Sequence, residues 1–290
     1  MNSRKKSRSY CLVVSCPDGV GIVAAISTFI AQRGGSLIES NHHTDLDKGW
    51  FFLRNVITAS SLSIDLDTFR DEFSVLAEEY AMEHWHMRDS EQPQKLALLA
   101  SHASHCLADL LHRWQSGELA CDICCVVSNH ENLRDMVEWH EITFYYVPTP
   151  PGAKAAALQQ SFDIVDKHGA DTVVLARYMQ IIPEEICRRY HGRLINIHHS
   201  FLPSFIGANP YQRAFERGVK LIGATSHYVT GDLDEGPIID QDVIRVTHSC
   251  DKDDMVRLGR GVESQVLARA VRYHLEGRVI IHGNKTVVFS

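Results

Sequence analysis

The sequence lacks any apolar run that approaches the roughly 20 residues of a membrane-spanning helix, and no apolar secretion-signal segment follows its basic first residues. Positive charge is also scarce, because 29 Lys and Arg stand against 36 Asp and Glu, for a formal net charge of -7. A chain of this charge presents no field that attracts nucleic acid or an anionic membrane. We therefore expect a cytoplasmic protein with no nucleic-acid partner and no membrane partner.

Paired metal-binding motifs are missing as well. Cys121 and Cys124 stand in a CxxC spacing, but Cys125 runs directly into Val126 and Val127, which is typical of a buried strand. No second Cys or His pair follows at zinc-site spacing, and the 17 histidines form no recognisable ligand cluster. We expect the eight cysteines to be reduced core residues, and we expect no metal and no cofactor.

What is present divides the 290 residues into two domains. Residues 1–8 form a basic tail that we expect to be disordered, and residues 89–93 form a polar linker. Residues 9–88 alternate strand and helix patterns in the order βαββαβ, which predicts a ferredoxin-like fold. The expected strands are residues 10–14, 36–44, 50–58 and 82–87, and the expected helices are residues 22–32 and 66–80.

The turn after the first strand carries Asp18 and Gly21 in the pattern Asp-x-x-Gly. With the βαββαβ order, this turn resembles ACT domains, small regulatory modules that often bind amino acids at a dimer interface. The resemblance implies an amino-acid effector whose carboxylate is held by amides at the start of the first helix and whose amino group meets Asp18. In the alternative, Asp18 caps the helix and the domain serves only in oligomerisation. A module that completes its sheet across a partner implies a homodimer or homotetramer.

Residues 94–290 change to repeated strand and helix units, which predicts an α/β fold with a doubly wound, mostly parallel sheet. The expected strands are residues 95–100, 123–128, 142–147, 172–176, 194–198, 220–228 and 237–246. The expected helices are residues 104–116, 131–138, 153–167, 184–190 and 251–275, with a hairpin around Gly283 and Asn284 at the end.

A polar motif ends one of these strands. Asn196 and His198 close an apolar strand and lead into His199-Ser200-Phe201-Leu202-Pro203, at the sheet edge where α/β enzymes bind ligands. The pattern Asn-x-His-x-Ser-x-Leu-Pro, together with the later loop around Asp234-Glu235-Gly236-Pro237, resembles the folate-dependent formyltransferases. The resemblance covers residues 94–290 and implies the formyltransferase fold, with Asn196, His198 and Asp234 as the catalytic residues.

Cleavage of a formyl group needs such a set. Negative charge builds on the formyl oxygen, where the Asn196 amide or a protonated His198 stabilises it. The leaving amine gains a proton and the attacking group loses one, which a carboxylate beside an imidazole provides. The order of residues leaves open whether Asp234 or His198 is the general base. Each residue alone also has a structural interpretation, as a strand end, a buried ring or a turn cap.

The resemblance also implies a folate pocket. One wall is expected after the strand at residues 172–176, and the other in the loop before Asp234. The first segment would otherwise be interpreted as core. The implied folate-binding residues are Met179, Gln180, Ile181, Ile182, Val229, Thr230, Gly231 and Asp232.

The formyl acceptor is the remaining question. Transferases that use a phosphorylated amine have a glycine-rich phosphate loop near the start of the domain, but this chain has Ala100-Ser-His-Ala-Ser-His-Cys106 there.

With the ACT-like domain and the doubled His198-His199, the chain resembles the formyltetrahydrofolate deformylases over its whole length. This implies hydrolysis of 10-formyltetrahydrofolate, as substrate rather than cofactor, to tetrahydrofolate and formate, which feeds purine synthesis and balances the one-carbon folate pool. His199 and His227 would hold the attacking water or tune Asp234, or they would serve only as structural residues. A transferase to a small amine, or an inactive folate-binding or amino-acid-binding regulator, are the alternatives.

Overall fold

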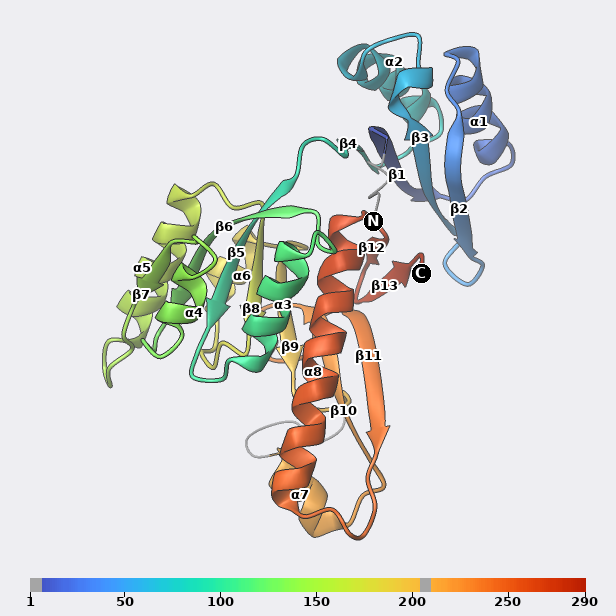
Figure 1. The fold of residues 1–290 in the computed structure, drawn as a ribbon. Helices are drawn as coiled ribbons and strands as arrows, with labels where there is room; N and C mark the ends of the chain where they lie inside the picture. Colours follow the sequence, from blue (N-terminus) through green and yellow to red (C-terminus); the bar gives the residue numbers. More distant parts are fainter. Residues whose placement is uncertain (1–6, 204–209) are drawn as a thin grey trace. The chain divides into compact units, whose positions relative to one another are not determined.

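The computed structural model describes residues 7–203 and 210–290, and the chain divides into two compact units (Figure 1). The first contains the chain up to Pro93 together with Glu276–Ile280 and Val287–Ser290, and the second contains Gln94–Leu275 and Ile281–Thr286. Residues 1–6 of the expected basic tail lie outside the described residues. Within the described part, Arg8 pairs with Asp89, with Nε 3.1 Å from Oδ1.

The first unit is a four-stranded antiparallel sheet in the order β2-β3-β1-β4, covered on one face by two helices. Ile26 of one helix and Phe69 and Phe73 of the other are fully buried in this core. The order of elements confirms the predicted ferredoxin-like fold. The elements are β1 (Ser9–Pro17), α1 (Ile22–Gln32), β2 (Leu37–Asp45), β3 (Trp50–Thr58), the 3-10 turn η1 (Ala59–Ser61), α2 (Leu66–Glu79) and β4 (His84–Asp89).

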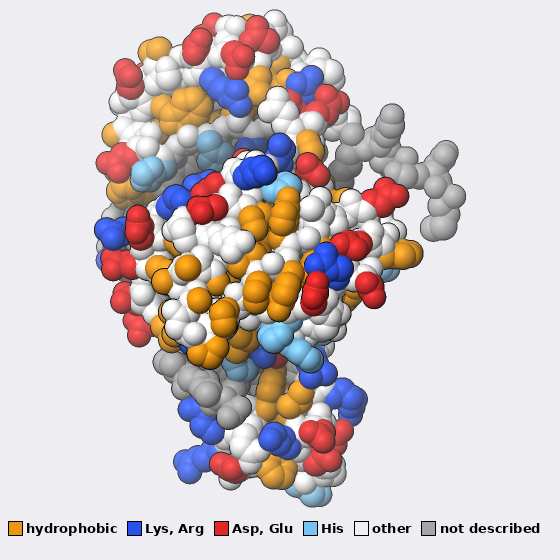
Figure 2. All heavy atoms as spheres, turned by 90° about the vertical axis from the view of Figure 1, so that its left-hand side faces the viewer, with side chains coloured by type: hydrophobic (Ala, Val, Ile, Leu, Met, Phe, Trp, Pro, Cys, Tyr) orange, Lys and Arg blue, Asp and Glu red, His pale blue; other side chains and the backbone are white. Residues whose placement is uncertain are grey.

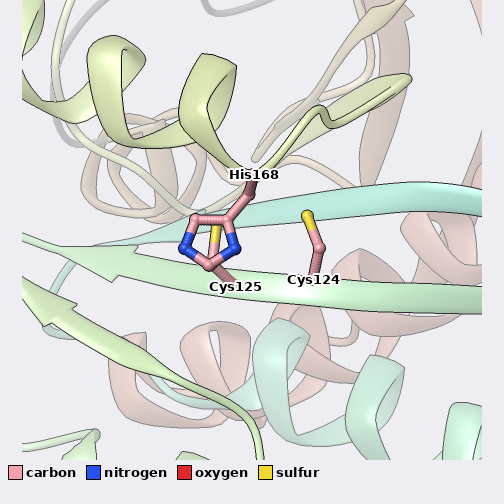
Figure 3. Close-up of side chains that lie close together, drawn as sticks. All are labelled: Cys124, Cys125 and His168. Carbon is pink, nitrogen blue, oxygen red and sulfur yellow. The ribbon is translucent and has the colours of Figure 1, made fainter.

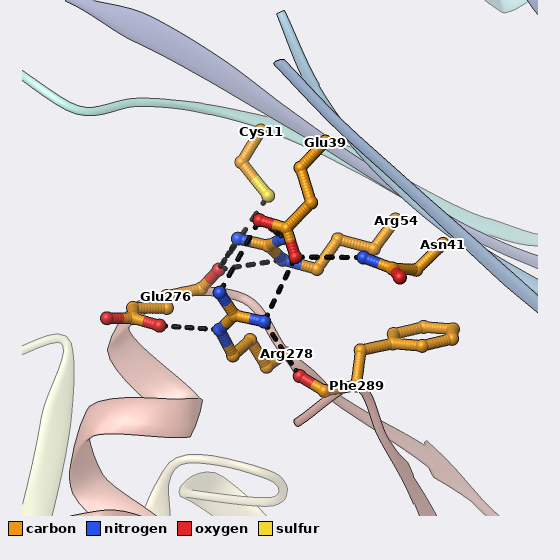
Figure 4. Close-up of polar contacts among 7 residues, drawn as sticks. All are labelled: Cys11, Glu39, Asn41, Arg54, Glu276, Arg278 and Phe289. Atoms are coloured by element: carbon orange, nitrogen blue, oxygen red, sulfur yellow. Dashed lines mark hydrogen bonds and ion pairs between the residues drawn. The ribbon is translucent and has the colours of Figure 1, made fainter. Parts of the chain in front are cut away.

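The end of the chain supplies part of this first unit. Ile280 packs with Val13 and Phe52 in a cluster separate from the helix-covered core. Beside it, both Nε and Nη2 of Arg54 donate to the carbonyl oxygen of Glu276, at 3.1 and 2.9 Å (Figure 4). We expected residues 94–290 to form the second domain, but Glu276–Ile280 and Val287–Ser290 belong to the first unit.

The second unit is built on a seven-stranded sheet in the order β11-β10-β9-β8-β5-β6-β7. Its strands from β9 to β7 pair in parallel, while β10 pairs antiparallel with both β9 and β11. This confirms the mostly parallel α/β sheet. The strands are β5 (Gln94–Ala100), β6 (Cys121–Ser128), β7 (Phe144–Tyr146), β8 (Thr172–Ala176), β9 (Leu194–His198), β10 (Leu221–Tyr228) and β11 (Ile238–Arg245), and β12 (Val279–His282) and β13 (Lys285–Val288) form the terminal hairpin.

Successive residues of β5, such as Leu98 and Leu99, are all buried. This burial shows that both faces of the sheet are covered, and helices provide the cover. One face forms a core with α5 and α6, and α8 packs against β9, β10, β11 and α3. The helices are α3 (His105–Gln115), α4 (Arg134–Glu138), α5 (Lys154–Lys167), α6 (Glu184–Arg189), α7 (Pro210–Arg217) and α8 (Lys252–Leu275). The sequence pattern did not predict α7, although a proline at the first helical position is a start signal.

Two surface observations bear on the expected partners. Figure 2 shows acidic and basic side chains interspersed over the described face of the second unit that carries α4, α5 and β7. None of the helices within residues 7–203 and 210–290 combines the length and apolar content that a membrane span requires.

Candidate active site

Asn196 and His198 lie on β9, and β10 runs antiparallel beside them. The register places His227 opposite Asn196 and Thr225 opposite His198. His198 and His227 are almost fully buried, with 5% and 2% exposure, while Asn196 is half-buried. The pairing of two strands thus brings an amide and two imidazoles from distant parts of the sequence into one place.

The hydrogen bonds of His227 fix how it meets Asn196. Its Nδ1 lies 2.9 Å from the backbone oxygen of Tyr228, which accepts only, so Nδ1 carries the proton. Nε2 is then the acceptor, and the Asn196 amide nitrogen donates to it at 3.2 Å. Burial lowers the pKa of His227, which keeps the ring neutral in this role. His227 therefore holds the Asn196 side chain in one orientation and leaves its second amide hydrogen to a ligand.

Asp234 completes the group, as its place in the loop predicted. Its Oδ2 lies 3.2 Å from His198 Nδ1, and its Oδ1 lies 3.7 Å from His227 Nε2. The loop reaches this position because Asp234 adopts a left-handed φ of 57° and because Gly236 passes close to β10. A Cβ atom at Gly236 would lie 1.8 Å from the Tyr228 carbonyl oxygen.

Charge at this group is set by burial and by its neighbours. Burial opposes ionisation of Asp234, but the hydrogen bond from His198 and the nearby imidazoles outweigh it and lower the pKa of the carboxyl group. An ionised Asp234 accepts a hydrogen bond from the protonated Nδ1 of His198. The other ring nitrogen of His198, Nε2, is buried and has no hydrogen-bond partner among the described residues. That nitrogen is the one available for proton exchange with a ligand.

His199 follows directly and is half-buried, with its ring centroid 5.2 Å from that of His198. Burial, with Arg177 and His198 nearby, lowers the pKa of His199 to about 4. The ring is therefore neutral near pH 7, and a neutral imidazole both donates and accepts hydrogen bonds. This suits a residue that positions water, which is one of the roles expected for His199.

A buried cluster behind His199 was not predicted from the sequence. Glu263 of α8 is 1% exposed and binds His105 Nε2 at 2.7 Å, Arg177 Nε at 3.2 Å and the Tyr211 hydroxyl. Burial opposes ionisation of Glu263, but the His105 and Arg177 partners outweigh it and lower its pKa. The Tyr211 ring lies 6.2 Å from the His199 ring, so the cluster adjoins the group formed by Asn196, His198 and Asp234. Its four members come from three helices and the loop after β8, and no short motif marks them.

The two expected folate walls lie beside each other. The Met179 amide donates to Ser101 Oγ at 3.0 Å, and the side chains of Met179 and Ile181 are exposed. Ile182 instead turns into the core, where Val229 packs against the same cluster, so Ile182 presents only its backbone. Gly231 approaches α6 closely, since an added Cβ would lie 2.9 Å from Glu184 Cγ.

The remaining residues of these walls are polar or exposed. Thr230 Oγ1 donates to the Asp232 carbonyl oxygen at 3.2 Å. Asp232 is exposed and Gln180 is half-buried. The loop before Asp234 is thus restrained by a contact between the Thr230 side chain and the loop backbone.

The expected effector residues lie in the first unit. Asp18 and Gly21 line a pocket of about 530 Å³ together with Ser27, His42 and Thr44. Asp18 does not cap α1, because the N-cap residue is Gly21 and no side chain caps the helix. Gly21 adopts a left-handed φ of 92°, which glycine permits.

The buried Glu263 cluster includes three possible metal ligands. His105, Cys106 and Glu263 do offer ligand atoms within 4.8 Å of one another. The guanidinium of Arg177 lies against the Glu263 carboxylate, however, and supplies the positive charge that a cation would otherwise bring.

Comparison with known proteins gives the class and then the family. The family model described as formyl transferase matches residues 94–271, so the second unit is a formyl transferase domain. A formyltetrahydrofolate deformylase from Bacillus subtilis (strain 168) is 46% identical over 96% of this chain and 93% of its own length. The chain belongs to the formyltetrahydrofolate deformylase family.

Solved structures agree over nearly the whole length. A formyltetrahydrofolate deformylase from Pseudomonas syringae pv. tomato str. DC3000 is 56% identical, with a TM-score of 0.97 over 99% of this chain and 96% of that one. The formyltetrahydrofolate deformylase from Burkholderia mallei ATCC 23344 is 43% identical, with a TM-score of 0.92 over 98% and 100% of the two chains. The likeness therefore includes both units, not the formyl transferase domain alone.

Proposed function

We propose that this protein hydrolyses 10-formyltetrahydrofolate to tetrahydrofolate and formate, with Asn196, His198 and Asp234 as its catalytic residues. The observation that supports the catalytic group most is the pair of Asp234 with His198 Nδ1, which leaves the buried Nε2 for the reaction. The deformylase relatives match both units of the chain. Formate released in this way would feed purine synthesis and balance the one-carbon folate pool.

In this mechanism, water attacks the formyl carbon while the Asn196 amide stabilises the charge that develops on the formyl oxygen. His198 Nε2 takes the proton that the water loses and returns a proton to the folate nitrogen as the carbon–nitrogen bond breaks. Asp234 orients the His198 ring and stabilises its protonated state. His199, neutral near pH 7, holds the water beside the formyl carbon.

The test is formate release by the purified protein with no amine added. We expect Asn196→Ala to lower kcat about 100-fold to 1000-fold, and Asp234→Asn to lower it about 100-fold to 10,000-fold. Glu235→Gln is the matched control, because Glu235 is exposed in the same loop and should leave the rate unchanged. A rate that requires an amine acceptor would contradict hydrolysis and favour the transferase alternative.

We further propose that the first unit is an ACT-type regulatory domain that binds an amino acid and joins copies of the chain into a homodimer or homotetramer. The pocket at Asp18 and Gly21 supports the ligand. The edge position of β2 and the exposed Val20, Val23 and Ile38 support association. The formate assay, repeated with single amino acids, tests the effector, and light scattering tests the assembly.

A further inference from the structure

Two adjacent cysteines of β6 face a histidine at the C-terminal end of α5. Cys124 and Cys125 lie beside His168, the C-cap residue that follows α5, and the two sulfur atoms and an imidazole nitrogen all lie within 4.8 Å of one another (Figure 3). Cys125 is fully buried, and Cys124 and His168 are half-buried. In the sequence, the CxxC spacing pairs Cys124 with Cys121. In the structure, Cys124 lies instead with Cys125 and with His168, a residue far along the chain.

A bulge in β6 explains how neighbouring side chains share one side. Successive residues of a regular strand point to opposite faces of the sheet. Here Leu96 pairs with Ile123 and Ala97 pairs with Cys125, so Cys124 is an extra residue with no partner in the register. Figure 3 shows both sulfur atoms on the side of the strand that faces His168. The bulge therefore places the thiols of two adjacent residues on the same side of β6.

The histidine is held by a second residue. Tyr145 of β7 places its hydroxyl 2.9 Å from His168 Nε2. When Nε2–H donates to the Tyr145 oxygen, Nδ1 is the nitrogen with a lone pair for a cation, and the bond restrains the ring against rotation. Histidine ligands in metal sites commonly have such a partner on the second nitrogen.

We propose that Cys124, Cys125 and His168 form a binding site for a thiophilic cation, with Zn²⁺ as the divalent ion that fits best. Two thiolates and one neutral imidazole cancel the charge of Zn²⁺, which suits a largely buried site. On binding, the two thiol protons leave to solvent and no electron is transferred. Mg²⁺ and Ca²⁺ are not expected to bind, because they require oxygen ligands.

The site is separate from the catalytic group. Leu96 of β5 pairs with Thr172 at the start of β8, and Val173 of β8 pairs with Leu194 at the start of β9. The cluster is thus level with the amino ends of these strands, whereas His198 lies at the carboxyl end of β9. A bound cation would join β6 to α5 and stabilise the fold of the second unit, and the proposal does not rest on the proposed function.

The test is titration of the reduced full-length protein with Cd²⁺ alone, followed by the ultraviolet absorption of cadmium–thiolate bonds. We expect one equivalent to bind and to raise the melting temperature. Cys124→Ser and Cys125→Ser should each weaken binding by at least about 100-fold, and His168→Gln by about 10-fold to 100-fold. Cys121→Ser is the matched control, because Cys121 is a half-buried thiol of the same strand outside the cluster.

Circular dichroism and melting without Cd²⁺ show whether each variant folds, so a loss of binding can be assigned to the site. Absorption that is absent in the unaltered protein would overturn the proposal. So would absorption of equal strength in Cys125→Ser, or a loss of equal size in Cys121→Ser.

Discussion

At the scale of single residues, sequence motifs identified the candidate catalytic residues but not the buried cluster that packs behind them. Asn196, His198 and Asp234 belong to short motifs, and the structure brings them together as the motifs implied. Glu263 lies in an ordinary helical stretch, and its partners come from two other helices and the loop after β8. A contact made only by tertiary packing leaves no local pattern, which is why Glu263 was missed.

The Glu263 cluster gives a prediction about stability and pH. Glu263→Gln keeps the shape of the side chain but leaves Arg177 and His105 without their buried anion, so we expect a loss of about 3 kcal/mol of unfolding free energy at pH 7. The folded-state pKa of Glu263 is lowered. Its stabilisation is therefore present above the unfolded pKa of about 4.3, and it is lost as the pH falls through the lower folded value.

Urea unfolding of the unaltered protein and of Glu263→Gln between pH 7 and pH 3 measures this difference. It should shrink as the solution becomes acidic. Glu131→Gln is the control, because Glu131 pairs with Arg134 on the surface and its loss should cost less than about 1 kcal/mol. A difference that stays constant with pH would show that the Glu263 charge is not responsible.

At the scale of elements, periodicity placed most strands and helices of the second unit within a few residues. The apolar runs of β5, β6, β8 and β9 are buried on both faces, and such runs are plain in a sequence. Periodicity could not show that β6 carries a bulge at Cys124, because the bulge depends on pairing with β5. The CxxC pattern was therefore interpreted as a regular buried strand.

Helix α8 offers a matched pair of glycines for a test at this scale. An added Cβ at Gly261 meets nothing within 4 Å, so we expect Gly261→Ala to stabilise the protein by about 0.5–1 kcal/mol. An added Cβ at Gly259 would lie 2.0 Å from the Tyr211 hydroxyl. Gly259→Ala should displace Tyr211 from Glu263 and cost about 1–3 kcal/mol. Thermal unfolding distinguishes the two variants. Equal changes in the melting temperature would show that Tyr211 does not need the space beside Gly259.

At the scale of the whole molecule, the sequence correctly predicted two folds but not where the end of the chain goes. The polar residues 89–93 marked the boundary between the two folds, because the pattern of strands and helices changes after them. The C-terminal hairpin has the local sequence signals of a hairpin, but these signals do not indicate which surface the hairpin packs against. Arg54 in β3 and Glu39 in β2 form an ion pair within the sheet. The C-terminal segment adds Arg278 as a partner for Glu39 and the Glu276 carbonyl oxygen as an acceptor for Arg54.

The last residues should therefore be needed for the stability of the first unit. A chain that ends at Thr286 loses Val287 and Phe289, which pack against Val13 and Phe52, and it loses the Phe289 carbonyl that accepts from Arg278. We expect a loss of about 2–3 kcal/mol and binding of a hydrophobic dye to the uncovered sheet. Deletion of the exposed Ser290 alone is the control. If the shorter chain melts like the full chain, the C-terminal segment only rests on the sheet, and the first unit is complete without it.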